Sequence, residues 1–192
     1  MVKFILQKSP KRSQLKKNLY KLLLARSDIT ASLNACELIL KDITDLGEKR
    51  LYPLTTAVVV CYVRPFTKNR PFGSLTKKWS KFSEVKFKNV HDKLIKARHE
   101  IFAHSDMNIR KVQIVPPNVS VIKNGKKEIK SSHIGTQSNF YLFSIDFFKS
   151  VRRLILDLGG RLQKEIDRLI NDLYSNLELP NKEFYLRIDE GL

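Results

Sequence analysis

The residues of this chain best suited to chemistry are an arginine and a histidine near its middle, Arg98 and His104. Arginine is a permanent cation whose planar fork of N–H donors matches a phosphate group. Histidine can both accept and donate a proton near neutral pH. On a strongly basic chain, the pair predicts phosphodiester chemistry on nucleic acid. The alternative is that two residues of a basic helix stand close together by chance.

An RNA substrate would reduce the number of groups that the protein must supply, because RNA carries its own nucleophile, the 2′-hydroxyl beside the scissile phosphate. A base, an acid and a cation for the charge of the transition state then suffice. Histidine supplies the first two and arginine the third, so no metal and no other cofactor is expected. The acidic residues of this region are scattered at ordinary ion-pair spacing from lysines, which argues against a two-metal site: Glu84, Asp92, Glu100 and Asp106.

The element that must position the pair is an amphipathic helix, with Arg98 and His104 near its C-terminal end. Its apolar residues recur at intervals of three and four positions: Phe87, Val90, Leu94, Ala97 and Ile101. On a regular helix, six residues turn the chain by about 600°, so the two side chains point about 120° apart and are separated by about 9 Å along the axis. A loosened helix end, or two copies paired about a twofold axis, would bring such groups together. The spacing therefore suggests a composite site in a homodimer.

The rest of the chain is mainly helical by its apolar period. We expect one helix over Pro10–Ala25 and a second, capped by Ser27 or Asp28, that ends near Gly47. Leu54–Val63 is apolar nearly all round, and periodicity alone leaves it between a buried helix and a strand. A long final helix starts near Ser144. Gly159-Gly160 is expected to weaken or kink that helix, and Trp79 could anchor the segment 68–83.

A small β-hairpin is expected at residues 111–130, before the last helix. Residues 111–115 and 119–123 alternate apolar and polar side chains, and Asn124-Gly125 is a hairpin-turn signal with a partner strand at 126–130. The predicted fold class is all-α, an antiparallel helical bundle with this insertion. A chain of 192 residues fits one domain over 1–192, with 1–8 and 180–192 as tails.

Charge and composition indicate the class of partner. Lysine and arginine outnumber the acidic residues 36 to 19, a formal net charge of +17, and the excess is concentrated before Asp28 and between Arg64 and Lys111. Such a basic face attracts polyanions, first nucleic acid and second an acidic membrane surface. Cys36 and Cys61 lie in apolar segments and are expected to be buried, reduced thiols. With no signal peptide and no apolar run long enough for a membrane span, we expect a cytoplasmic protein.

The segment around the pair resembles the HEPN superfamily, whose motif is an arginine and a histidine separated by four to six residues, the first often polar. That polar residue is His99 here. The run Lys96–Asp106, which contains Ala103-His104-Ser105-Asp106, is similar to the form found in abortive-infection and toxin-type members. Cys61–Phe66 also resembles that subgroup. The local resemblance covers about Leu54–Asn108, and the order of helices extends it loosely over most of the chain.

The resemblance implies a helical bundle that dimerises, with Arg98 and His104 of both copies in one cleft. It also implies metal-independent RNA cleavage in a toxin–antitoxin or antiviral-defence setting, often with a nucleotidyltransferase-type antitoxin as partner. Some members bind nucleotides or are inactive, so catalysis does not follow from the family alone. The 111–130 hairpin is not part of the common core.

Four residues are candidates for supporting roles, each with an alternative. Arg64 follows an apolar helix, and it could reach the phosphate beside Arg98 or favourably cap that helix's C-terminus. Tyr62 could stack on a base or pack in the core, and the core is favoured. His99 is a second acid/base or, more simply, a surface histidine. Asp106 could orient His104 or only end the helix. His91, seven residues before Arg98, is more readily a structural histidine.

Three classes of function fit these observations. The first is a metal-independent endoribonuclease, carried by Arg98 and His104. The second is a nucleic-acid- or nucleotide-binding module without chemistry, carried by the charge excess. The third is an interaction protein whose basic face meets an acidic partner protein.

Overall fold

The computed structural model describes residues 10–45, 48–68, 71–102, 111–118, 120–123, 126–129, 133–139 and 143–175, with 177, 179, 181–183 and 185–186. Its α-helices are α1 (Pro10–Asp42), α2 (Leu51–Val63), α3 (Val85–Ala97) and α4 (Ile145–Tyr174). Short turns of 3₁₀-helix, η1 (Arg64–Phe66) and η2 (Lys77–Ser80), and one π-helical turn, η3 (Arg98–Phe102), lie between them. The prediction of a mainly helical protein is confirmed.

The two helices predicted for the first third of the chain are in fact one, so the cap at Ser27 or Asp28 is wrong. α1 runs unbroken for 33 residues. Neither glycine nor proline stands near Asp28, and the buried face continues past it through Ala25, Ile29 and Cys36. The Asp28 carboxylate accepts a hydrogen bond from the Arg64 side chain and caps no helix.

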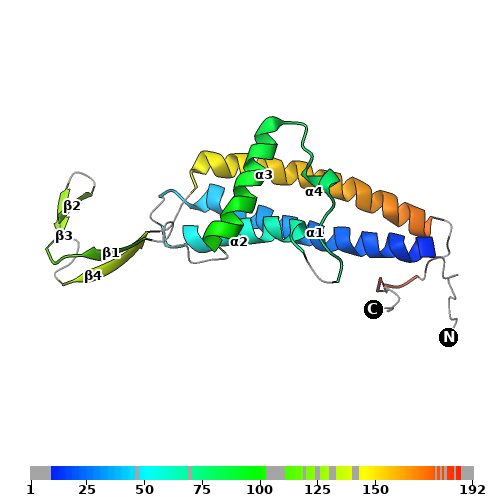
Figure 1. The fold of residues 1–192 in the computed structure, drawn as a ribbon, viewed down its shortest axis with the longest axis horizontal. Coiled ribbons are helices and arrows are strands. Elements are labelled where there is room, and N and C mark those ends of the chain that lie inside the picture. Colours follow the sequence, from blue (N-terminus) through cyan, green and yellow to red (C-terminus); the bar gives the residue numbers. More distant parts are fainter. Residues whose placement is uncertain are drawn as a thin grey trace.

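Helices α1 and α4 form a long antiparallel pair (Figure 1). Near one end the Arg12 guanidinium donates to the Leu173 carbonyl at 2.9 Å, and nearer the other the Cys36 thiol donates to the Phe148 carbonyl at 3.4 Å. Burial raises the pKa of the Cys36 thiol to about 12. Cys61 is only partly buried, and both thiols are free. The prediction of burial is therefore confirmed for Cys36.

Helix α2 lies against α1, where the buried Ser32 hydroxyl donates to the Val58 carbonyl at 2.8 Å. The ambiguity of Leu54–Val63 is thus resolved in favour of a helix. The core lies between α1, α2, α3 and α4 and is built largely from leucine, isoleucine and valine. Ser144 caps α4, its hydroxyl accepting from the Phe147 N–H at 3.2 Å. α4 then continues through Gly159-Gly160 without interruption, since Leu158 and Leu162 on either side are fully buried. Among the described residues, no helix is long and apolar enough to cross a membrane.

The described strands are β1 (Lys111–Val115), β2 (Ser120–Lys123), β3 (Lys126–Ile129) and β4 (Gly135–Asn139). β2 pairs with β3, and β1 pairs antiparallel with β4 so that Lys111 faces Asn139 and Val115 faces Gly135. Figure 1 shows both pairs beyond one end of the helices. β4 lies outside the 111–130 hairpin expected from the sequence. The sequence did not indicate this strand, because Gly-Thr-Gln-Ser-Asn lacks the apolar alternation that marks a strand. Asn124 and Gly125 are outside the described residues.

Candidate functional site

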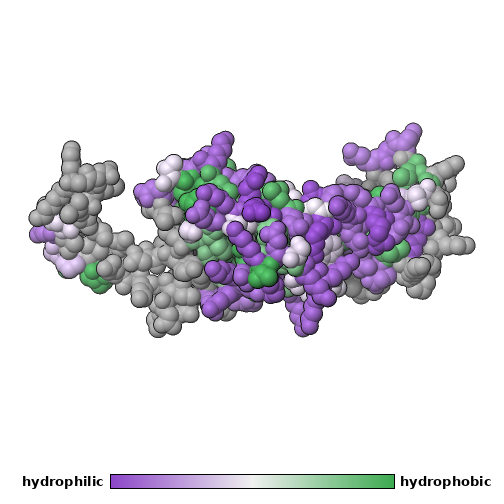
Figure 2. Space-filling view, turned by 90° about the horizontal axis from the view of Figure 1, so that it is seen from above, coloured by the Kyte–Doolittle hydropathy of each residue, from purple (hydrophilic) through white to green (hydrophobic). Residues whose placement is uncertain are grey.

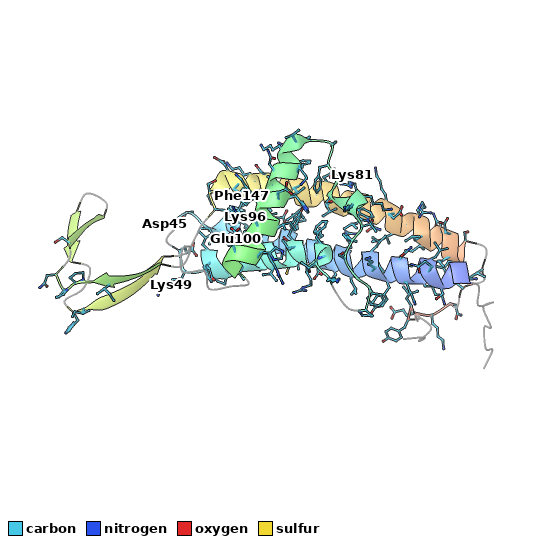
Figure 3. All side chains as sticks on the ribbon, in the orientation of Figure 1. Asp45, Lys49, Lys81, Lys96, Glu100 and Phe147 are labelled. Atoms are coloured by element: carbon cyan, nitrogen blue, oxygen red, sulfur yellow. The ribbon has the colours of Figure 1, made fainter. Side chains whose placement is uncertain are left out.

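Helix α3 carries the candidate site and is amphipathic, as predicted. Its inner face buries Phe87, Val90, Leu94 and Ala97. Its outer face is charged. There Lys88 pairs with Asp92, and Lys96 pairs with Glu100 at 3.8 Å. Figure 3 shows Lys96, near the end of α3, and Glu100, in η3, at the strand end of the bundle, where Asp45 and Lys49 also lie.

The end of α3 departs from the regular helix that the sequence suggested. The helix stops at Ala97, and residues Arg98–Phe102 form one turn of π-helix, which packs against α2. A π turn holds one more residue than an α turn, is rare, and is frequent at functional sites. The 120° angle calculated for a regular helix therefore does not describe this segment.

Arg98 is the residue of the predicted pair that the structure describes. Its side chain is partly buried, and it forms no hydrogen bond or ion pair with any residue in the described part of the chain. Its neighbour His99 is exposed. A guanidinium without a carboxylate partner keeps all its N–H donors for a ligand. His104 and Asp106 lie outside the described residues.

Tyr62 and His91 belong to the core, which is the favoured alternative for both. The Tyr62 ring is 0% exposed, and its hydroxyl lies 2.9 Å from His91 Nδ1. Phe66 and Phe82 pack on the imidazole, at ring-centroid distances of 4.7 and 5.3 Å. Burial lowers the pKa of His91 to about 4 and raises that of Tyr62. Tyr62 thus has no exposed face on which a base could stack.

The protonation of His91 leads to a test of this core. An unfolded histidine has a pKa near 6.5. Between that pH and about 4, His91 is therefore protonated in the unfolded chain and neutral in the folded one. The free energy of unfolding should therefore fall by about 3 kcal/mol as the pH drops from 7 toward 4. Urea denaturation at pH 7 and pH 4.5 would measure the loss. His91→Gln, which cannot titrate, should lose clearly less; an equal loss in both proteins would show that His91 is not responsible.

Arg64 has a partner that neither sequence alternative foresaw. It stands just after the C-terminal end of α2, and its Nη1 donates to Asp28 Oδ1 on α1 at 2.7 Å. Arg98, by contrast, follows α3 seven residues beyond His91, which contacts the same end of α2 through Tyr62. Within the described residues, no hydrogen bond or ion pair joins Arg64 to Arg98. That Arg64 could reach a phosphate beside Arg98 stays a prediction.

Neither a family model, nor a curated protein, nor a solved structure matches this chain. The resemblance to the HEPN superfamily therefore rests on the sequence motif alone. The residues that sequence reasoning missed are Lys21, Lys78, Glu165 and Arg168, which line one hollow. Only the basic segments that contain Lys21 and Lys78 gave a signal, because the four residues are far apart along the chain.

Proposed function

We propose that this protein is a metal-independent endoribonuclease in which Arg98 and His104 act on RNA through its own 2′-hydroxyl. The observation that carries the proposal is the state of Arg98. Its guanidinium has no partner among the described residues and extends from a π turn at the end of an amphipathic helix. A permanent cation held this way can neutralise the negative charge that builds on the phosphoryl oxygens in the transition state. His104 is the proposed base and acid, and His99 and Asp106 are the proposed supporting residues.

The charge of α3 favours RNA as the substrate. Lys86 and Lys93 are exposed on α3, the helix that Arg98 follows, and neither forms an ion pair within the described residues. Figure 2 shows that much of the face seen from above in Figure 1 is hydrophilic, and that hydrophobic residues gather toward the strand end of the helices. The exposed lysines suit a phosphate backbone, because affinity for nucleic acid comes largely from cations that displace its counterions.

The proposal includes three finer points taken from the HEPN resemblance. The helices form a HEPN-like bundle, two copies pair so that both sets of Arg98 and His104 share one cleft, and the setting is abortive infection or a toxin with a nucleotidyltransferase-type antitoxin. The dimer has its own test: light scattering after size exclusion should give twice the mass of the 22.3 kDa chain.

The activity is tested by incubating the purified protein with labelled single-stranded RNA in the presence of EDTA. Cleavage should continue, and the 5′ products should carry 2′,3′-cyclic phosphate ends, because the 2′-hydroxyl is the nucleophile. RNA with 2′-O-methyl groups should remain intact, since it lacks that nucleophile. Loss of cleavage with EDTA, or cleavage of the methylated RNA, would contradict the mechanism.

A binding module without chemistry is the second candidate, favoured by the excess of cations over carboxylates. It predicts intact RNA in the same assay together with binding that weakens steeply as salt rises. Replacing His104 would then leave that binding unchanged.

A further inference from the structure

Two hollows adjoin on the side of α1 that the segment 71–80 covers. The first has a volume of about 260 Å³ and the second about 160 Å³. Lys21 and Leu75 line both of them. Lys21 therefore stands where the two hollows meet, and together they form a groove along α1, which we call the Lys21 groove.

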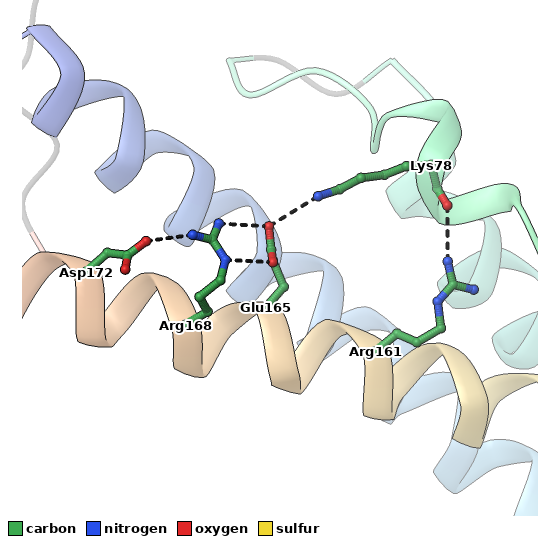
Figure 4. A network of polar contacts seen from close by, with 5 residues as sticks. All are labelled: Lys78, Arg161, Glu165, Arg168 and Asp172. Atoms are coloured by element: carbon green, nitrogen blue, oxygen red, sulfur yellow. Dashed lines mark hydrogen bonds and ion pairs between the residues drawn. The ribbon is translucent and has the colours of Figure 1, made fainter.

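The walls of the Lys21 groove are held by contacts between distant parts of the chain. Trp79 is 6% exposed and anchors η2, with the Arg161 guanidinium 5.7 Å from its ring centroid. The Arg161 side chain also donates to the Lys78 carbonyl at 3.1 Å (Figure 4). Phe72 packs against Tyr20 of α1, with ring centroids 4.8 Å apart. The segment 71–80 is thus fixed to both α1 and α4.

Every carboxylate of the groove already has a cationic partner. Glu165 accepts from Lys78 at 3.1 Å and from Arg168 at 3.0 Å, and Arg168 also bonds Asp172 at 2.6 Å (Figure 4). These hydrogen bonds, chiefly the one from Arg168, lower the pKa of Glu165 to about 2. In the first hollow Asp28 is paired with Arg64.

Lys21 is the cation of the groove that takes part in none of these ion pairs. It forms no hydrogen bond or ion pair within the described residues, and it is partly buried between the two hollows. The other lining cations are engaged: Arg64 pairs with Asp28, Lys78 with Glu165, and Arg168 with Glu165 and with Asp172 outside the lining. Cations outnumber carboxylates along the groove, and Lys21 is the one without an ion pair among the described residues, so the groove suits an anion.

The groove also has apolar walls beside that cation. Leu24 and Phe72 line the first hollow next to Lys21. An anionic group attached to a flat, weakly polar one fits this combination, as the phosphate and base of a nucleotide do. Each hollow is smaller than the cavities that enclose a whole small ligand, which are roughly 300 to 1,000 Å³. A strand that crosses the groove fits better than a free nucleotide enclosed by it.

We propose that the Lys21 groove binds single-stranded nucleic acid, with one phosphate on Lys21 and an adjoining base or ribose against Phe72 and Leu24. It is a binding surface distinct from Arg98. The choice of RNA as the natural strand rests on the proposed function. The groove and its charge are independent of that function.

The test is binding of a short, fluorescently labelled 2′-O-methyl RNA, measured by anisotropy over a series of salt concentrations. Lys21→Gln should weaken binding several-fold at low salt and reduce the slope of log K against log salt by about 0.7, the value for one phosphate contact on a single strand. Lys21→Arg should keep most of the affinity. The matched control is Lys41→Gln, an exposed lysine of the same helix outside the groove, which should change neither quantity.

Equal losses in Lys21→Gln and Lys41→Gln, no loss in Lys21→Gln, or no binding by the wild type would each overturn the proposal. Displacement of the RNA by uridine monophosphate at micromolar concentration would overturn the proposal, because it would show that the groove binds a free nucleotide. Displacement by an acidic peptide alone would point to a protein partner. Because 2′-O-methyl RNA has no 2′-hydroxyl to attack, these results do not depend on whether the protein cleaves RNA.

Discussion

Replacing His104 by alanine is expected to lower the rate of RNA cleavage by about 10²- to 10⁴-fold, the usual contribution of a positioned acid or base. Replacing Arg98 by alanine should lower it by about 10²- to 10³-fold, because the charge on the phosphorane then has no fixed cation. Arg98→Lys should recover only part of the loss, since an ammonium keeps the charge but not the planar fork of donors. Initial rates in EDTA would measure all three.

Two control variants have matching residue types. His133→Ala removes an exposed histidine, and Arg153→Ala removes an exposed arginine of α4. Neither residue has a proposed role, so both variants should cleave RNA at the wild-type rate. Cleavage that persists in His104→Ala would exclude the proposed base. Equal losses in Arg98→Ala and Arg153→Ala would mean that general positive charge matters and the position of Arg98 does not.

Placing a proline at Thr30 is expected to lower the free energy of unfolding by about 3 kcal/mol or more, because α1 is one continuous helix. Proline in a helix interior removes a backbone hydrogen bond and clashes with the carbonyl four residues earlier. Position 30 is well suited to the test, since the Thr30 side chain is exposed and its loss disturbs no packing. Urea denaturation of the wild type and Thr30→Pro gives the difference directly.

The same variant separates the two descriptions of this region. If a helix began at Ser27 or Asp28, residue 30 would lie in its first turn, where proline is tolerated. Thr30→Ala is the control and should unfold at nearly the wild-type urea concentration. A Thr30→Pro protein as stable as Thr30→Ala would mean that α1 is broken at Asp28 after all.

The fold could be predicted from the sequence where the signal came from residues close together along the chain. The inner faces of α3 and α4, and the placing of His91 in the core, followed from spacings of three and four residues, which a helix imposes on its own. Ser27 and Asp28 misled for the same reason. Their types are those of helix caps, yet the apolar stripe through Ala25 and Ile29 continued past them, and burial of that stripe outweighed the preference of two side chains.

The candidate site, too, could be predicted only in the features that depend on residues close together along the chain. Arg98 and His104 could be chosen from residue type and spacing, as could the helix that carries Arg98. The π turn after Ala97 could not, because one extra residue in a turn leaves no mark on apolar periodicity. Nor could the buried hydrogen bond of Tyr62 to His91, which joins residues on two helices.

The sequence by itself determined the helical class, the basic charge and the pair that could act on a phosphate, since these depend on composition and on neighbours within a turn or two. Only the tertiary structure decided which cations remain unpaired. Lys21 and Lys78 are both lysines of basic segments, but Glu165, 87 positions further along the chain, pairs with Lys78 and leaves Lys21 open. Such pairing is set by how α1, η2 and α4 pack together, because packing brings together charges that are far apart along the chain.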